Sequence, residues 1–236
     1  KSPVTNGIFR RLYSPMDEGN IKDGERVFYT PNNAQRLDTY RTLLSDVDLK
    51  YWPYILGPLL SMSSIHVNTA GVFKGFYKDS KTGRGMFGGA ANNALQRIRG
   101  EIKLKMPVFS NFTSEKLILN GDVRSVVSQV ENIDLAYFDP PYNQHPYGSN
   151  YFMLNLLVEY VEPSAVSKVS GIPLDWNRSD LNKKQLAYDA LRSSLSNVDA
   201  RFILVSYNSE GFIKPEEMRI MLEELGTIEE MQLQYN

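Results

Sequence analysis

The chain has 236 residues, of which 42% are hydrophobic and 22% are charged, and it contains no cysteine and two histidines. This composition supports a buried core in one or two domains. It excludes disulfides, thiolate metal sites, cysteine nucleophiles and histidine-rich metal sites, so no metal is expected. No apolar run approaches the roughly 20 residues of a membrane span and no secretory signal is visible, so we expect a cytoplasmic protein that does not enter a membrane.

Charge is distributed unevenly along the chain. The net charge is −1, but residues 1–110 hold 16 Lys and Arg against 9 Asp and Glu, a net +7, whereas the remaining residues hold 10 against 18, a net −8. A basic front half on an acidic back half is typical of a DNA-facing lobe joined to a catalytic lobe. The alternative is two solvated surfaces that differ in sign. Lys1 is not an initiator methionine, which predicts a longer product.

The first 70 residues predict a loop region followed by two helices. Residues 1–30 carry turn-forming pairs around short apolar pieces, which predicts loop with brief extended segments. Thr30 and Pro31 then form a cap and a first helical position, and the apolar spacing predicts a helix to about Asp46. The apolar segment 54–67 predicts a core helix that is kinked or restarted at Gly57-Pro58.

A segment rich in aromatic and basic residues follows. Phe73, Phe76 and Tyr77 are interleaved with four cations: Lys74, Lys78, Lys81 and Arg84. This mixture binds backbone phosphates and stacks nucleobases, so the four cations are candidate DNA-binding residues. The alternative is a solvated mobile loop, because glycines make the segment flexible.

Residues 117–119, Leu-Ile-Leu, predict a short strand that leads into a helix with an apolar valine face. Asn120 and Asp122 lie between the two elements. A carboxylate just past the end of a strand either accepts a hydrogen bond from a ligand or caps the following helix, and both roles are compatible.

The sequence Ile133–Phe138 predicts a buried parallel strand, because it is a mostly apolar run of six residues. Pro140 and Pro141 end it by removing two backbone donors. In open α/β sheets ligands bind at the carboxyl ends of the strands, so Asp139 and Tyr142 would project into a crevice. The alternative is an ordinary Asp-Pro turn with an exposed tyrosine.

Asp139-Pro140-Pro141-Tyr142 after a strand resembles the catalytic motif of S-adenosylmethionine-dependent amino-methyltransferases, above all those of adenine N6 in DNA. Together with residues 143–157 and Ser206–Gly211, it resembles the D12 class of bacterial restriction-modification methyltransferases over nearly the whole chain. The resemblance implies an α/β fold: a Rossmann-like, doubly wound methyltransferase sheet with a mainly helical target-recognition insertion. It also implies the substrates, S-adenosyl-L-methionine and adenine in double-stranded DNA, and a cognate restriction endonuclease that acts separately.

The chemistry of methylating an amine assigns roles within the motif. The Asp139 carboxylate and the Pro140 carbonyl would accept the two hydrogens of the amine, Pro141 would stiffen the loop, and Tyr142 would stack on a flipped base. The resemblance implies further contacts, with the cofactor from Asn120, Asp122, Phe138 and Asp139, and with DNA from Asn143, Tyr147 and Asn150.

We therefore expect residues 1–110 to form a helical and loop region with the DNA target-recognition insertion, and residues 111–236 to form a partial catalytic core. The glycine loop that holds the methionine part of the cofactor in the resembled family is missing from this sequence. This departure suggests that the chain alone binds cofactor weakly or not at all. Two alternatives stay open: the same chemistry on RNA, and a non-catalytic DNA-binding remnant.

The remaining elements complete the prediction. A helix from Phe152 to about Tyr160 would pack on the sheet, and residues 163–182 would form a long irregular connection that could fold over substrate. Further along, the pattern predicts a helix at 186–195, a buried strand at 201–207, an amphipathic helix at 215–225 and the start of a final strand at 228–235.

Overall fold

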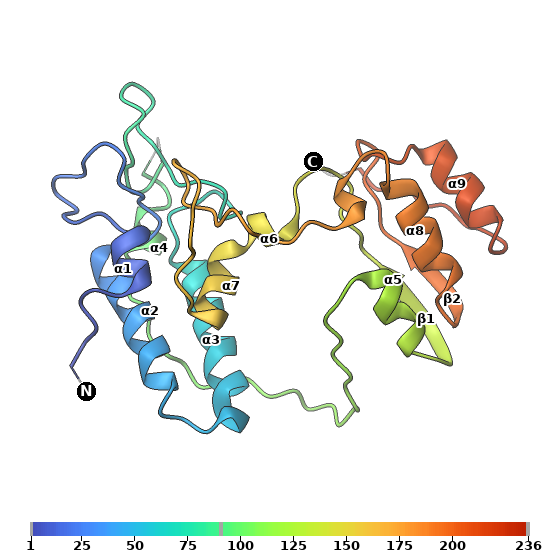
Figure 1. Cartoon of the computed structure of the whole chain (residues 1–236), viewed down its shortest axis with the longest axis horizontal. Coiled ribbons are helices and arrows are strands. Elements are labelled where there is room, and N and C mark those ends of the chain that lie inside the picture. The colour runs from blue at the N-terminus through green and yellow to red at the C-terminus, as the bar shows by residue number, and fades with distance from the viewer. Residues whose placement is uncertain (1, 90–91, 235–236) are drawn as a thin grey trace. The chain divides into compact units, whose positions relative to one another are not determined.

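The computed structural model describes residues 2–89 and 92–234, and the chain divides into two compact units. Unit 1 comprises the residues up to Thr113 together with Tyr147–Trp176, and unit 2 comprises Ser114–Pro146 and Asn177–Asn236 (Figure 1). Lys1 and Tyr235 lie outside the described residues. None of the helices in the described part of the chain combines the length and apolar character needed to cross a membrane.

Unit 1 contains both helices predicted in the first 70 residues. Helix α2 spans Pro31–Leu44, and the side chain of Thr30 accepts a hydrogen bond from Asn33 N at 3.2 Å, so the predicted cap is confirmed. After the 3₁₀ turn η1 (Leu49–Tyr51), helix α3 spans Trp52–Ile65. Pro58 lies inside α3, which continues as one helix and is not restarted there.

The prediction for the first 30 residues is wrong at one place, because Ile8–Leu12 forms the short helix α1. Its N-cap residue is Gly7, which has no side chain to cap the helix. The acceptor comes instead from α2, where the Asp38 carboxylate accepts hydrogen bonds from Phe9 N at 3.0 Å and Arg10 N at 2.8 Å. The signal for this helix is therefore distant in sequence.

The core of unit 1 is mainly aromatic. Phe9, Tyr13, Phe28 and Phe152 have at most 2% of their surface exposed and contact one another through tilted and edge-to-face ring pairs. Helix α7 (Phe152–Glu159) supplies the last of these rings and packs beside α3. The predicted helix after the motif is confirmed, but its buried side chains belong to this core rather than to the surface of the sheet. Two short helices complete unit 1, α4 (Leu95–Arg99) and α6 (Tyr147–Asn150).

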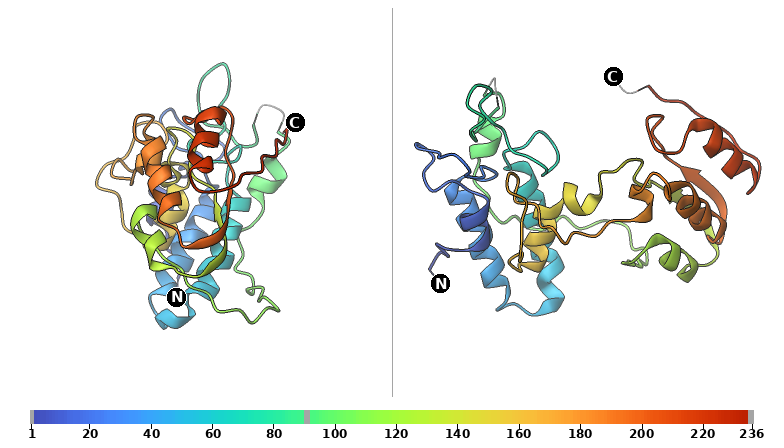
Figure 2. Two further views of the ribbon diagram at one scale, coloured as in Figure 1. Left: turned by 90° about the vertical axis from the view of Figure 1, so that its right-hand side faces the viewer. Right: turned by 45° about the horizontal axis from the view of Figure 1, so that its top comes forward.

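Unit 2 is built on a parallel pair of strands. Strand β1 spans Ile133–Phe138 and β2 spans Ala200–Val205, with Ile133 opposite Ala200 and Phe138 opposite Val205. Helices α8 (Ala187–Ser196) and α9 (Pro215–Glu223) pack in one core with Phe138, Ile203 and Val205. The two helices are the orange and red coils of Figure 2. The predicted strands and helices of this region are thereby confirmed. Helix α5 (Val123–Val126), continued by the 3₁₀ turn η2 (Val127–Gln129), confirms the predicted valine helix.

The opposite face of the strand pair is exposed, so the prediction that both strands are fully buried is wrong. Leu135, Tyr137, Phe202 and Leu204 on that face each have 53–59% of their surface exposed. Side chains alternate between the two faces of a strand, and the strand residues that pack in the core with α8 and α9 lie on the other face. The fold is thus a mixture of helices with a small parallel sheet.

Two predicted strands are not formed. Residues 117–119 lie in irregular backbone, with Leu117 71% and Ile118 90% exposed, and residues 228–234 are irregular as well. A strand persists only where a neighbouring strand pairs with its backbone donors and acceptors. Within the described residues β1 and β2 pair only with each other, so neither apolar run finds a partner.

Candidate active site

The loop Asp139–Tyr142 follows β1 and is anchored by backbone hydrogen bonds at both ends. Ser206 N, just after β2, donates to the Phe138 carbonyl at 2.9 Å, and Phe212 N donates to the Tyr142 carbonyl at 2.9 Å. The ring of Pro140 is buried. A loop held in this way, with two prolines in its middle, keeps its acceptors in place before any ligand binds.

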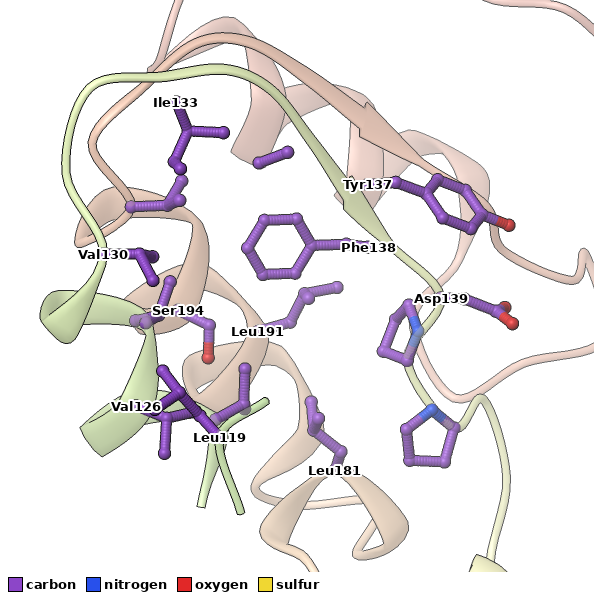
Figure 3. Close-up of a pocket in the computed structure, with 16 residues that line it drawn as sticks. Leu119, Val126, Val130, Ile133, Tyr137, Phe138, Asp139, Leu181, Leu191 and Ser194 are labelled. Atoms are coloured by element: carbon purple, nitrogen blue, oxygen red, sulfur yellow. The ribbon is translucent and has the colours of Figure 1, made fainter. Parts of the chain in front are cut away.

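The acceptors of this loop are open. Asp139 is exposed, and no side chain or backbone donor among the described residues bonds to its carboxylate or to the Pro140 carbonyl. In Figure 3 the Phe138 ring is directed towards the apolar side chains of unit 2, whereas the Asp139 carboxylate is directed away from them. The Asp139 carboxylate therefore projects away from the core at the carboxyl end of β1. That Asp139 and Tyr142 line a crevice for a ligand stays a prediction.

Tyr142 is 39% exposed and its ring lies edge-on to Tyr207, with centroids 6.4 Å apart and an interplanar angle of 77°. Tyr207 is fixed in turn, because its hydroxyl accepts a hydrogen bond from Ile213 N at 3.3 Å. Burial also raises the pKa of Tyr207 above the ordinary value. Gly211 lies so close to the Tyr207 ring that a β-carbon would collide with it. The sequence analysis includes Tyr207 only as part of the stretch Ser206–Gly211 that carries the resemblance, and it does not single it out.

A cavity of about 460 Å³ lies behind the loop in unit 2 (Figure 3). Its walls are mostly apolar, and Asp139, Pro140 and Pro141 form one side of it. The valines of α5 and η2 form part of the remaining wall, together with Leu119, Phe138, Leu181 and Leu191. The mostly apolar walls suit a flat heteroaromatic ring, and Ser194 and Asp139 are polar residues of the lining.

Asp122 caps α5 and is also ion-paired. Its Oδ1 accepts a hydrogen bond from Arg124 N at 3.0 Å, so the predicted capping role is confirmed. Both carboxylate oxygens also pair with the Arg124 guanidinium, at 3.0 and 3.2 Å, and this pairing holds the pKa of Asp122 below its usual value. The carboxylate therefore stays ionised and remains an acceptor at neutral pH. Asn120, the other candidate in this segment, is exposed.

The candidate DNA-binding residues after the motif are divided between the units. Asn143 belongs to unit 2, where its Oδ1 accepts a hydrogen bond from His145 N at 2.9 Å. Tyr147 and Asn150 belong to unit 1. The half-exposed ring of Tyr147 stacks on Tyr151 at 5.8 Å, and the side-chain oxygen of Asn150 is buried with no hydrogen-bond partner among the described residues.

The basic segment of unit 1 is an ordered antiparallel turn in which Lys78 pairs with Gly85. The Asp79 carboxylate fixes its tip by accepting hydrogen bonds from the backbone of Lys81 and Thr82. Lys78 and Lys81 are exposed, whereas Arg84 is ion-paired with Asp23 at 2.8 Å. Lys74 is half-buried, and burial lowers its pKa. The two exposed lysines are thus the cations best placed to meet a polyanion.

Comparison with known proteins assigns the family. The model of the D12 class N6 adenine-specific DNA methyltransferases matches residues 60–221. The type II methyltransferase M.CviAII of Paramecium bursaria Chlorella virus 1 is 28% identical, over 97% of this chain and 63% of its own length. Modification methylase StsI of Streptococcus sanguinis is 26% identical over 94% of this chain and 32% of its own length. The type II methyltransferase M.NlaIII of Neisseria lactamica is 24% identical, over 89% of this chain and 60% of its own length.

No solved structure matches the chain. The chain spans less than two thirds of the length of each of these three relatives. The family model nevertheless covers more than half of the chain, including β1, the Asp139–Tyr142 loop and β2. The chain therefore belongs to the D12 class N6 adenine-specific DNA methyltransferase family.

Proposed function

We propose that the full-length protein transfers a methyl group from S-adenosyl-L-methionine to the N6 amine of adenine in double-stranded DNA. The observation that carries the proposal is the pair of open acceptors, the Asp139 carboxylate and the Pro140 carbonyl, on an anchored loop at the end of β1. Family membership supports the same reaction. The names of the relatives, type II methyltransferase and modification methylase, support a restriction-modification role. The proposal includes a cognate restriction endonuclease that acts separately and a cytoplasmic location.

The two acceptors address the main difficulty of the reaction. The lone pair of an exocyclic adenine amine is delocalised into the ring, which makes the nitrogen a poor nucleophile. Hydrogen bonds from its two hydrogens to Asp139 and Pro140 would draw the nitrogen towards tetrahedral geometry and aim its lone pair at the methyl group. The amine becomes acidic only after methylation, so no strong general base is needed.

Tyr142 provides the surface for the base. A base in a duplex must leave the stack before its amine can reach a buried site, and stacking on an aromatic ring offsets about 1 to 3 kcal/mol of that cost. The partly exposed ring of Tyr142, held edge-on by Tyr207, is next to the two acceptors in sequence and lies on the same anchored loop. Pro141 keeps ring and acceptors at a fixed spacing.

The residues present also fit the cofactor. S-adenosylmethionine supplies an electrophilic methyl group on a sulfonium when it is bound. An ionised Asp122 offers an acceptor for the adenine amine of the cofactor, and the apolar cavity beside Phe138 offers walls for its ring. Asn120 and Asp139 complete the proposed set of cofactor contacts.

We extend the proposal to the fold and to the division of labour along the chain. The exposed apolar face of β1 and β2 supports a larger, doubly wound Rossmann-like sheet in the full-length protein, since such sheets are covered on both faces. Residues 1–110 would then contain the mainly helical target-recognition insertion and residues 111–236 part of the catalytic core. DNA contacts are proposed for Asn143, Tyr147 and Asn150, and for the basic segment with Lys74 and Arg84.

Replacing Lys78 and Lys81 together by alanine is expected to weaken DNA binding almost equally on all sequences. Each lost phosphate contact should reduce the magnitude of the slope of log affinity against log salt concentration by about one. The slope of the double variant should therefore be smaller in magnitude by about two. Binding is measured by fluorescence anisotropy at several salt concentrations. The matched control replaces Lys116 and Lys184 of unit 2, and an equal loss in that control would contradict a specific role for the basic segment.

The reaction itself is tested by incubating the full-length protein with isotope-labelled S-adenosylmethionine and either duplex DNA or RNA. The nucleic acid is digested to nucleosides, and the labelled one is identified by mass. We expect labelled N6-methyladenine from DNA alone. Label in RNA would favour an RNA methyltransferase with the same motif, and no label in either from folded protein would favour a DNA-binding remnant.

A further inference from the structure

We propose that the single 3₁₀ turn η3, Asp180–Asn182, is a positioning element for the methyl-transfer site. Asn182 at its end holds the catalytic loop, and Asp180 at its start orients the Asp122 carboxylate through Arg124. The inference rests on the proposed function, because it gives these residues a part in that reaction.

Asn182 is the buried end of the element. It is 4% exposed, and its side-chain Nδ2 donates a hydrogen bond to the Asn143 carbonyl at 2.9 Å. Asn143 directly follows Tyr142, so this bond is a third anchor of the catalytic loop beside those from Ser206 and Phe212. A buried amide that bonds to a loop carbonyl restricts the loop, because breaking the bond leaves an unsatisfied polar group inside the protein.

The turn itself is rigid. The Ser179 side chain accepts a hydrogen bond from Leu181 N at 3.2 Å, and the Ser179 carbonyl accepts one from Asn182 N at 3.0 Å. Leu181 is 6% exposed and packs with α8 in the core of unit 2. The position of Asn182 is therefore set by the core and not by the loop that it holds.

Asp180 acts on the other side of the turn. Its Oδ2 pairs with the Arg124 guanidinium at 2.9 Å, and its Oδ1 pairs with Lys183 Nζ at 2.8 Å. Arg124 thus bridges two carboxylates, those of Asp180 and Asp122. The planar guanidinium forms hydrogen bonds in fixed directions, so anchoring it on Asp180 fixes the orientation of Asp122.

Asp122 Oδ1 accepts hydrogen bonds from Arg124 N and Nε, whereas Oδ2 accepts one from the guanidinium alone, so Oδ2 keeps a lone pair for the amine of a ligand. Arg124 therefore positions Asp122 without occupying all of its acceptor capacity. Three consecutive residues in this way connect the proposed cofactor carboxylate with the proposed catalytic loop. The two ends of the turn should accordingly affect different kinetic parameters.

The test uses the full-length protein and variants at three positions. Asn182→Leu should lower the single-turnover rate about tenfold or more at saturating DNA and cofactor, with the cofactor KM nearly unchanged, because a displaced loop misaligns the acceptors. Asp180→Asn should raise the cofactor KM about two- to fivefold with kcat nearly unchanged, because the pair is partly solvated. Arg192→Gln breaks the exposed Arg192–Glu224 pair on α8 and should change neither parameter.

Asn182→Asp, which keeps the side-chain size, is the second variant if the leucine substitution prevents folding, and it should show the same loss of rate. Amide hydrogen exchange of residues 142–145 provides a readout independent of activity, and it should speed up about tenfold in both Asn182 variants but not in Arg192→Gln. A purely structural role would lower kcat and raise KM together in both the Asn182 and Asp180 variants. That result, or unchanged exchange of the loop, would overturn the inference, whereas an inactive wild-type protein with the expected exchange would instead contradict the proposed function.

Discussion

Replacing Asp139 by alanine is expected to reduce methyl transfer by about a hundred- to a thousandfold, with DNA affinity nearly unchanged. A fixed group that stabilises developing charge in a dry site contributes about that much to the rate. Asp139 is the one carboxylate of the anchored loop Asp139–Tyr142, and it directly precedes Pro140. Its carboxylate has no partner among the described residues, so removing it breaks no bond that holds the fold.

The measurement is a single-turnover assay with labelled methyl donor at saturating DNA, together with an independent DNA-binding titration. The matched control is Asp134→Ala, which removes another exposed carboxylate from β1 itself and should retain the wild-type rate. Activity of the Asp139 variant within tenfold of wild type would show that the carboxylate does not hold the amine. A parallel loss of DNA affinity would assign Asp139 to binding instead.

The sequence predicts those elements whose signals are local. The cap Thr30 with Pro31 marks α2, and the amphipathic spacing after Pro215 marks α9, because in both cases the residues that begin the helix are its own neighbours. Helix α1 has no such signal, since its cap is the side chain of Asp38. The apolar run 117–119 shows the converse case. It has the local pattern of a strand but forms none, because no strand within the described residues pairs with it.

The candidate site likewise contains one part that local sequence predicts and one part that depends on distant residues. The residues that the motif names lie on one loop, and their order in the sequence is enough to place them together at the end of β1. The groups that hold this loop come from later segments: Asn182 from a stretch that looks like an irregular connection, and Phe212 and Tyr207 from the loop after β2. Nothing in the spacing of these residues indicates which backbone carbonyl each will meet. Only the tertiary structure supplies that information.

The second large effect concerns the stability of unit 1 at Asp38, which is fully buried. Its Oδ1 accepts hydrogen bonds from Phe9 N at 3.0 Å and from the Tyr160 hydroxyl at 2.9 Å, and its Oδ2 accepts one from Arg10 N at 2.8 Å. Gly7 lies against this carboxylate so closely that a β-carbon there would collide with it. One side chain of α2 therefore connects α1 and the end of α7.

Replacing Asp38 by alanine should cost about 3 kcal/mol of local stability, because the buried Phe9 N and two part-buried donors, Arg10 N and the Tyr160 hydroxyl, lose their acceptor. Amide exchange of residues 9–12 should then become about a hundredfold faster. Hydrogen-exchange mass spectrometry of the α1 peptide measures this directly. The control Asp175→Ala removes an exposed carboxylate of unit 1 and should leave the α1 peptide unchanged. Equal protection in both variants would mean that α1 is held by its apolar contacts alone.

The contribution of Asp38 to the stability of unit 1 should depend on pH in a definite direction. Burial is the largest influence on Asp38 and raises its pKa above the ordinary value, outweighing its hydrogen bonds. The folded chain therefore binds this proton more tightly than the unfolded chain, whose aspartate titrates at about pH 3.9. The contribution of Asp38 to stability should be greatest below that pH and should fall as pH rises through the folded pKa. The isosteric variant Asp38→Asn cannot titrate at this position. The free energy of unfolding of the wild type minus that of Asp38→Asn should therefore decrease between the unfolded and the folded pKa of Asp38 and stay level at higher pH. A difference that increases with pH would show that the hydrogen bonds from α1 and Tyr160 outweigh the cost of burying the charge.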